Sequence, residues 1–250
     1  MLRTLRSWRL TRTVGGFAPS GVALPPAQLR MGGAHFLDNA ALVATARRDV
    51  ARLAEHGLTR DGSLLDWGCG AGRLAIGVIE TWNGIARYDG IDVQRDLIRW
   101  ATRHVARAGI AFTHVDIANA RYNRGGTREH RIPGSSASYD ALYAYSVLSH
   151  MDASELADYL REIRRLLKPD GFAWVTAFVE EGVADATENP EGYGPIPWEG
   201  ALHCVRFERR FFESAVRSAG LAVGRFEHGQ ETDGQSSYVL RPLPESISGS

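Results

Sequence analysis

The sequence predicts an α/β fold in which a mostly parallel sheet of seven strands is covered by helices on both faces. Short apolar stretches of strand character alternate with amphipathic stretches of helical character from residue 39 onward, and this alternation is typical of doubly wound parallel sheets. The last two expected strands follow each other without a helix, which predicts that the last strand is antiparallel. At 250 residues the chain is long enough for one large core.

Five stretches place apolar residues at the three- and four-residue spacing of an amphipathic helix. They run over 39–56, 74–82, 97–105, 156–167 and 208–219. Gly57 and Asn83 stand where the first and second helices are expected to end. Asp152, followed three residues later by Glu155, predicts a capping box at the start of the fourth helix.

The expected strands are short apolar stretches between these helices and after them. They cover 63–67, 87–93, 111–115, 141–147, 172–178, 221–226 and 236–240. Residues 168–171 (KPDG) are expected to end a helix and to turn into the fifth strand. Residues 121–138, rich in Arg and Gly, are expected to form a surface loop. The Gly- and Pro-rich residues 181–204 are too long for a simple connection, which favours a functional or mobile loop.

Residues 64–73 (LLDWGCGAGR) carry the strongest functional signal. They have the pattern of a buried strand that runs into a glycine-rich turn and then a helix. Glycines at such a turn let the backbone approach a nucleotide-like ligand closely. Arg73 stands where a dinucleotide-binding loop would have its third glycine, which disfavours a nicotinamide cofactor.

Four further motifs follow the glycine loop in a fixed order along the chain. They are Asp92 at the end of the second strand, Asp116-Ile117 after the third, residues 143–150 (YAYSVLSH) at the fourth and residues 167–171 (LKPDG) before the fifth. With these motifs, residues 39–241 resemble the class I S-adenosylmethionine (SAM)-dependent methyltransferases. The resemblance implies a Rossmann-like fold and SAM as cofactor, with S-adenosylhomocysteine as its product.

The resemblance also implies roles for individual residues. Asp66 is expected to help to bind the amino group of SAM, Asp92 both ribose hydroxyls and Asp116 the adenine amino group. Tyr145 and Ser146 belong to the segment expected to line the methyl-transfer site. The full set of expected cofactor-binding residues is Asp66, Gly68, Cys69, Gly70, Gly72, Arg73, Asp92, Val93, Asp116, Ile117, Tyr145 and Ser146.

Two domains are expected: a basic extension at 1–38, with Gly33, His35 and Phe36 as candidate lid residues, and a methyltransferase domain at 39–250. Residues 25–33 and the closing stretch 235–241 resemble bacterial methyltransferases that act on small molecules or glycans. His150, which follows the fourth strand, is the candidate general base, because a hydroxyl acceptor must lose its proton. The alternative is that Ser149 and His150 only organise the start of the next helix.

The amino-acid composition of the chain indicates which binding partners and which cellular location are expected. The net charge of zero disfavours nucleic acid as acceptor, and no metal site or stable membrane association is expected. The two cysteines do not form a disulfide framework, which favours a cytoplasmic location. The basic residues and spaced apolar residues of the first 20 positions leave an organelle transit peptide as the alternative.

The sequence therefore predicts a SAM-dependent methyltransferase that modifies an oxygen, or less favourably a nitrogen, of a small metabolite or sugar. One alternative is a SAM-binding regulatory or partner protein without transferase activity. A less favoured alternative is an NAD-dependent oxidoreductase. The acceptor and the oligomeric state are not predicted.

Overall fold

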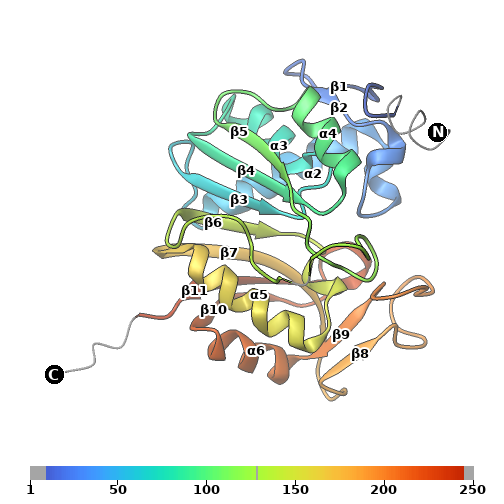
Figure 1. Cartoon of the computed structure of the whole chain (residues 1–250), viewed down its shortest axis with the longest axis vertical. Coiled ribbons are helices and arrows are strands. Elements are labelled where there is room, and N and C mark those ends of the chain that lie inside the picture. Colours follow the sequence, from blue (N-terminus) through green and yellow to red (C-terminus); the bar gives the residue numbers. More distant parts are fainter. Residues whose placement is uncertain (1–9, 128, 245–250) are drawn as a thin grey trace. The chain divides into compact units, whose positions relative to one another are not determined.

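The computed structural model describes residues 10–127 and 129–244, which divide into two compact units. The N-terminal unit ends at Arg128 and the C-terminal unit begins at Glu129. Figure 1 shows the elements of each unit. Leu2, Leu5 and Trp8, whose spacing among basic residues is the basis of the alternative of a transit peptide, lie outside the described residues.

The N-terminal unit contains a parallel sheet of three strands, β3 (Ser63–Trp67), β4 (Arg87–Asp92) and β5 (Ile110–His114). Helices α3 (Arg73–Trp82) and α4 (Arg95–His104) connect these strands, and α2 (Asn39–Glu55) packs against α3. The two helices approach so closely that a Cβ atom at Gly77 would lie 2.3 Å from the carbonyl oxygen of Ala46. Glycine at position 77 therefore sets the distance between α2 and α3.

The extension in front of α2 contains a two-stranded antiparallel hairpin and two short 3-10 helices in its described part. These elements are β1 (Gly16–Phe17), β2 (Ala23–Leu24), η1 (Ala27–Leu29) and η2 (Ala34–Leu37). The side-chain nitrogen of Trp100, on α4, donates to the carbonyl oxygen of Thr13 at 2.8 Å. The described part of the extension is thus attached to the N-terminal unit.

The C-terminal unit is built around β7 (Leu167–Glu180), which pairs in parallel with β6 (Tyr139–Ala144). Strand β11 (Ser236–Pro242) lies antiparallel to β7, and β10 (Leu221–Glu227) pairs with β11. The helical elements of its described part are η3 (Leu148–His150), α5 (Ala153–Leu166), α6 (Arg209–Ser218) and η4 (Thr232–Gly234). Asp152 and Glu155 form the expected capping box at α5.

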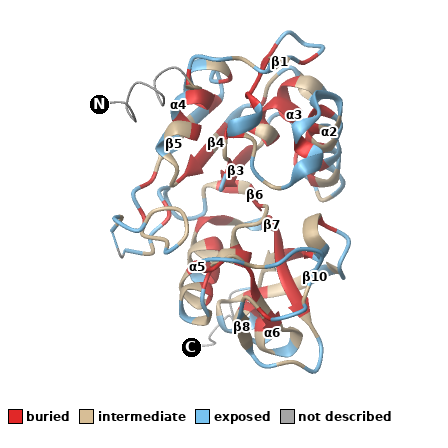
Figure 2. Ribbon diagram, turned by 90° about the vertical axis from the view of Figure 1, so that its right-hand side faces the viewer, coloured by how far each residue is buried: buried red, intermediate tan, exposed pale blue. Residues whose placement is uncertain are grey.

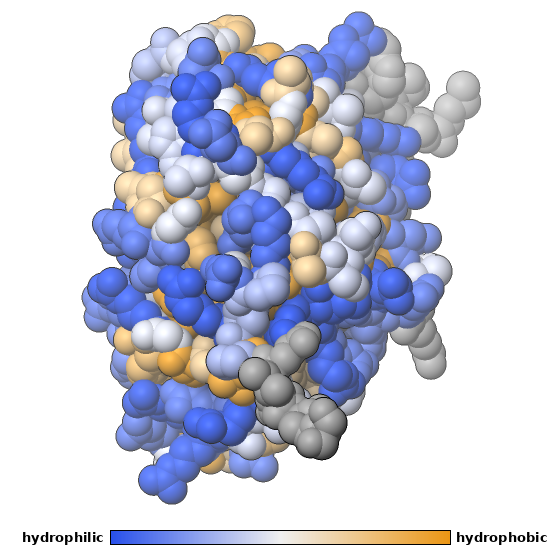
Figure 3. Space-filling view, turned by 90° about the vertical axis from the view of Figure 1, so that its left-hand side faces the viewer, coloured by the Kyte–Doolittle hydropathy of each residue, from blue (hydrophilic) through white to orange (hydrophobic). Residues whose placement is uncertain are grey.

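All seven expected strands are present, three in the first unit and four in the second, and the last strand is antiparallel as predicted. In Figure 2 the strands are largely buried, whereas helices are buried on one side. On the face seen in Figure 3, hydrophilic residues predominate and apolar residues form small separate groups. Among the described residues, no helix has the length and apolar character needed to cross a membrane.

The structure differs from the expected element bounds in two places. The fifth strand begins earlier than expected, because residues 168–171 belong to β7 as an irregularity between the pairs Tyr139–Leu167 and Ala141–Phe172. Residues 181–204 contain a further strand, β8 (Ala186–Glu188), which pairs with β9 (Val205–Glu208). Strand β9 in turn pairs in parallel with the last residues of β7, so both ends of this insertion are held by backbone hydrogen bonds.

Candidate functional site

The glycine loop connects β3 to α3 and is tied to the neighbouring strand. The backbone N–H groups of Gly68 and Cys69 both donate to the carbonyl oxygen of Ile91, at 2.9 and 3.0 Å. The Cys69 side chain is buried, and burial raises the pKa of its thiol well above the usual value. The Cys69 side chain therefore packs on the interior side of the loop, and its backbone N–H is bonded within the protein.

Gly70 is half-buried and adopts a left-handed conformation, with φ of 55°. A Cβ atom at this position would meet nothing within 4 Å, so the space beside the backbone is open. The Gly70 N–H donates to Oδ2 of Asp92 at 2.9 Å. The loop thus leaves room for a ligand directly beside a buried carboxylate.

Asp92 is the last residue of β4 and is 7% exposed. Its Oδ1 atom accepts a hydrogen bond from the backbone N–H of Gln94 at 2.7 Å, while Oδ2 accepts the one from Gly70. Burial raises the pKa of Asp92 to about 6, and the backbone hydrogen bonds oppose this rise. Each oxygen has a second lone pair, so a fixed carboxylate can also accept hydrogen bonds from a diol.

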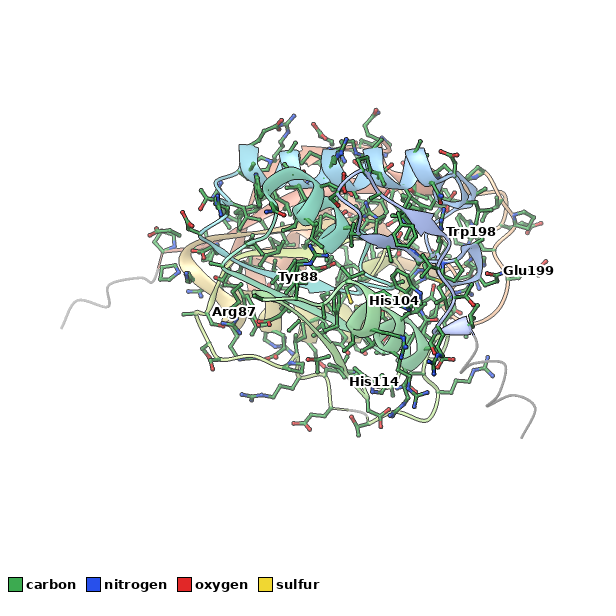
Figure 4. The ribbon with its side chains drawn as sticks, turned by 90° about the horizontal axis from the view of Figure 1, so that it is seen from above. Arg87, Tyr88, His104, His114, Trp198 and Glu199 are labelled. Atoms are coloured by element: carbon green, nitrogen blue, oxygen red, sulfur yellow. The ribbon has the colours of Figure 1, made fainter. Side chains whose placement is uncertain are left out.

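Asp66 lies on β3 and is 2% exposed. The hydroxyl of Tyr88, on β4, donates to its Oδ2 atom. Figure 4 labels Tyr88 and its neighbour Arg87, which lie on the buried and the exposed side of β4. Burial raises the pKa of Asp66 to about 7, whereas Tyr88 and the guanidinium of Arg73 act in the opposite direction. A cationic ligand group would favour the ionised form of this carboxyl group in the same way.

Arg73 begins α3 and is held from two sides. Its Nη1 atom lies 2.6 Å from Oδ2 of Asp49, a fully buried residue of α2, and its guanidinium lies 5.0 Å from the centre of the Phe36 ring. Asp49 also contacts Arg48 and Arg52. Sequence reasoning missed Asp49, although an acidic residue between apolar positions of an amphipathic helix is a recognisable signal.

Asp116 and Ile117 follow β5 and are held by the loop that comes after them. The side-chain amide of Asn123 donates to Oδ1 of Asp116 at 3.0 Å and to the carbonyl oxygen of Ile117 at 2.9 Å. The backbone N–H of Thr127 donates to the carbonyl oxygen of Asp116 at 2.7 Å. The first residues of the expected surface loop 121–138 thus contact Asp116 and Ile117, which are predicted to bind the cofactor. Asn123 was not predicted as part of the site.

Val93 and the candidate lid residues also lie in the N-terminal unit. The carbonyl oxygen of Val93 accepts a hydrogen bond from the ring of His114, at 3.2 Å. Gly33 comes directly before η2, while Phe36 is buried and contacts Arg73. His35 is exposed, and its ring centre lies 4.0 Å from that of Phe36.

Tyr145, Ser146 and His150 belong to the C-terminal unit. The Tyr145 hydroxyl lies 2.6 Å from the hydroxyl of Thr232, and its ring is stacked on that of Trp174 at 6.0 Å. These contacts hold Tyr145 at the end of β6.

Ser146 adopts a left-handed conformation with φ of 54°, which is rare for a residue other than glycine. Its backbone N–H donates to the Thr176 hydroxyl at 2.8 Å, and its own hydroxyl accepts from the side-chain amide of Gln235. The Thr176 hydroxyl donates to Gln235 at 2.8 Å, which closes a three-residue network. This conformation explains why β6 ends at Ala144 and not at the expected residue 147.

His150 is the last residue of η3, and its Nδ1 atom lies 2.9 Å from the carbonyl oxygen of Leu202. A carbonyl oxygen only accepts hydrogen bonds, so Nδ1 carries the proton and the lone pair of the neutral ring is on Nε2. Leu202 lies in the insertion 181–204, which sequence reasoning did not connect with His150.

The family model described as "Methyltransferase domain" matches residues 64–171, from β3 through the turn-like start of β7. Residues 64–171 of this chain therefore match a methyltransferase domain. The match begins with the strand that contains Asp66 and includes Asp92, Asp116 and His150. This match agrees with the methyltransferase activity and the SAM cofactor that the sequence predicts.

Solved structures show the same fold over a larger part of this chain. Magnesium protoporphyrin IX methyltransferase (ChlM) from Synechocystis PCC 6803, with bound SAM, is 14% identical at a TM-score of 0.55, covering 96% of this chain and 91% of that chain. The [4+2]-cyclase SpnF is 21% identical at a TM-score of 0.56, covering 79% and 81%. The mitomycin 7-O-methyltransferase MmcR is 16% identical at a TM-score of 0.54, covering 81% and 55%.

Proposed function

We propose that this methyltransferase transfers the methyl group of SAM to an oxygen of a small metabolite or sugar, with nitrogen as the less favoured acceptor atom. The observation that carries the proposal is the pair of buried carboxylates, Asp66 and Asp92, of which Asp92 accepts a hydrogen bond from Gly70, where the space beside the backbone is open. A pair of this kind suits a ligand that has both a cationic group and a diol. The resemblance of the glycine loop to SAM-dependent methyltransferases supports the same assignment.

In this proposal Asp92 accepts hydrogen bonds from the ribose hydroxyls, and Asp66 accepts from the amino group of the methionine part. Asp116 binds the adenine amino group, with Val93 and Ile117 beside it. The glycine loop fits the cofactor because Gly70 leaves open space where a side chain would stand. Tyr145 and Ser146 are proposed to line the site of methyl transfer.

The bound cofactor supplies a methyl group that its sulfonium already activates. The chain's own residues have to orient the acceptor and, for a hydroxyl acceptor, remove its proton. We propose His150 as the residue that takes this proton, at Nε2. The hydrogen bond from Nδ1 to Leu202 supports this role because it fixes the tautomer that leaves the lone pair on Nε2.

We also propose that residues 39–250 form the catalytic part and that residues 1–38 are an extension to it. The contacts of Thr13 with Trp100 and of Phe36 with Arg73 support a structural attachment of the extension to the N-terminal unit. We propose that Gly33, His35 and Phe36 cover the glycine loop.

The proposed reaction is tested by release of S-adenosylhomocysteine from SAM in the presence of a panel of hydroxyl-bearing small metabolites, sugars and, for comparison, primary amines. We expect release with a hydroxyl acceptor, a loss of at least about 100-fold in His150→Ala, and retention of SAM binding in that variant. Turnover with amines alone, or undiminished turnover in His150→Ala, would overturn the acceptor class or the role of His150, respectively.

A second candidate is a protein that binds SAM without transferring its methyl group. The structural neighbour SpnF is described as a [4+2]-cyclase, so a likeness in fold to this neighbour leaves the reaction open. Tight SAM binding without release of S-adenosylhomocysteine from any acceptor of the panel would favour this candidate.

A further inference from the structure

The insertion 181–204 is built so that one of its backbone carbonyl groups points at His150. Leu202 is 8% exposed and adopts a left-handed conformation with φ of 48°. A leucine in this region is strained, and such strain persists only where surrounding contacts impose it. The carbonyl oxygen of this strained residue is the hydrogen-bond acceptor for Nδ1 of His150, at 2.9 Å.

The strained residue is held from its other side by a carboxylate. The backbone N–H of Leu202 donates to Oε1 of Glu188 at 2.7 Å. Glu188 is the last residue of β8 and pairs with Val205 of β9, so its backbone is part of the sheet at the base of the insertion. A continuous chain of contacts therefore runs from the sheet through Glu188 and Leu202 to the His150 ring.

Asn189 fixes the two strands of the insertion next to this contact. Its Oδ1 atom accepts from the backbone N–H of Cys204 at 3.0 Å, and its side-chain amide donates to the carbonyl oxygen of Gly200 at 2.7 Å. Its own backbone N–H donates to the carbonyl oxygen of Cys204 at 2.7 Å. These bonds hold the chain on both sides of Leu202, so the direction of its carbonyl group is determined by the insertion.

An aromatic cluster packs the remainder of the insertion onto the end of β7. Phe178 lies edge-on to Tyr193 and Trp198, at ring-centre distances of 5.9 and 5.2 Å. The Trp198 side chain, labelled in Figure 4, donates to the carbonyl oxygen of Tyr193 at 2.6 Å. The insertion is thus a packed element of the C-terminal unit, anchored by both side chains and strand pairing.

We propose that Glu188 and Leu202 are positioning residues that fix the tautomer and the orientation of His150. Glu188 holds the Leu202 peptide, and the Leu202 carbonyl group keeps the proton of the neutral imidazole on Nδ1, so that the lone pair of the ring is on Nε2. The importance of these two hydrogen bonds for catalysis rests on the role of His150 proposed above. The hydrogen bonds themselves lie within the C-terminal unit, and their effect on the His150 tautomer is measurable without cofactor or acceptor.

The experiment is nitrogen-15 NMR of the histidine rings in the full-length protein, with His150 assigned by its absence in His150→Gln. In the wild type we expect the neutral His150 ring to carry its proton on Nδ1. In Glu188→Ala the ratio of the Nδ1–H to the Nε2–H form should fall about tenfold, because an unheld peptide no longer presents its carbonyl group. Glu188→Gln is the matched control, since its side-chain oxygen still accepts from the Leu202 N–H.

Three outcomes decide the proposal. An Nε2–H ring in the wild type, or an unchanged ratio in Glu188→Ala, would overturn it. A lower ratio of the Nδ1–H to the Nε2–H form in Glu188→Ala, together with the wild-type ratio in Glu188→Gln, would support it. Glu188 is exposed, so its replacement by alanine removes no core packing and the variant is expected to fold. Undiminished turnover in His150→Ala would refute only the catalytic role, because the NMR result does not depend on it.

Discussion

The two units present polar residues at the ends of their parallel strands by different physical means. In the N-terminal unit, Asp66 and Asp92 are buried carboxylates, held by a tyrosine hydroxyl and by backbone N–H groups. In the C-terminal unit, Ser146 and His150 are held by neutral hydrogen bonds. Buried carboxylates suit a ligand that has a cationic group and hydroxyl groups, whereas neutral donors and acceptors suit an uncharged group. This difference supports the proposal that the first unit binds the cofactor.

The largest effect is expected from breaking the buried ion pair of the N-terminal unit. Arg73→Ala leaves the Asp49 carboxylate with weaker partners and should lower the free energy of unfolding by about 2–4 kcal/mol in urea titrations. Asp49→Asn combined with Arg73→Ala should restore much of this loss, because no uncompensated carboxylate remains. Arg95→Ala, at an exposed arginine of α4, is the control and should change stability by less than about 0.5 kcal/mol. Equal effects of the two single arginine variants would contradict the importance of the pair.

The second prediction separates stability from binding at Asp66. Its pKa of about 7 lies above the value of about 4 of an unfolded chain, so between these pH values the folded protein holds more protons. The contribution of Asp66 to the unfolding free energy therefore falls as the pH rises from about 4 to 7. Asp66→Asn removes this loss and should raise stability at pH 8 by on the order of 1–3 kcal/mol, while SAM binding weakens at least about tenfold. A variant that is both less stable at pH 8 and unchanged in SAM affinity would argue against this role.

The third prediction concerns the pH dependence of SAM affinity. If ionised Asp66 binds the amino group, protonation of Asp66 competes with binding, and a pKa of about 7 makes the SAM dissociation constant about tenfold larger at pH 6 than at pH 8. Calorimetric titration at both pH values measures this ratio, and Asp66→Asn should flatten it. An equally steep dependence in the variant would assign the titration to another group.

The smallest effect is expected in the C-terminal unit, at the strained Ser146. Both Ser146→Gly and Ser146→Ala lose the hydrogen bond from Gln235, but only alanine keeps the penalty of a left-handed backbone. The glycine variant should therefore be more stable than the alanine variant by about 1 kcal/mol in chemical denaturation. Equal stabilities of the two variants would show that the strain is relieved elsewhere.

Much of the fold was predictable because its signals are local. Gly57, Asn83 and the Asp152–Glu155 box mark helix ends through the conformation or bonding of single residues, and all seven strands lie near their expected positions. The short strands β8 and β9 were not predicted, because they have only 3 and 4 residues. Segments of this length are too short to show a clear alternation of apolar and polar residues.

Some features of the candidate site were likewise predictable from the sequence, and others were not. The glycine loop was predictable because its geometry requires glycine at defined positions. The partners of its residues were not, since Asp49, Tyr88 and Asn123 reach the site from other elements, at distances along the chain that the fold alone determines. The contact of His150 with Leu202 escaped prediction for the same reason, and because its acceptor is a backbone carbonyl group that any residue could supply.

The most direct test of the central claim, that the N-terminal unit binds SAM through Asp92, is the melting temperature of the full chain with SAM, S-adenosylhomocysteine or NAD. Asp92→Ala removes the proposed ribose ligand, and Asp96→Ala, at a half-buried position of α4, is the control. Ligand at about 100 times its dissociation constant should stabilise the wild type and Asp96→Ala by about 2.7 kcal/mol for both adenosyl compounds, with no stabilisation of Asp92→Ala. Stabilisation by NAD alone, or equal stabilisation of Asp92→Ala by SAM, would contradict the account.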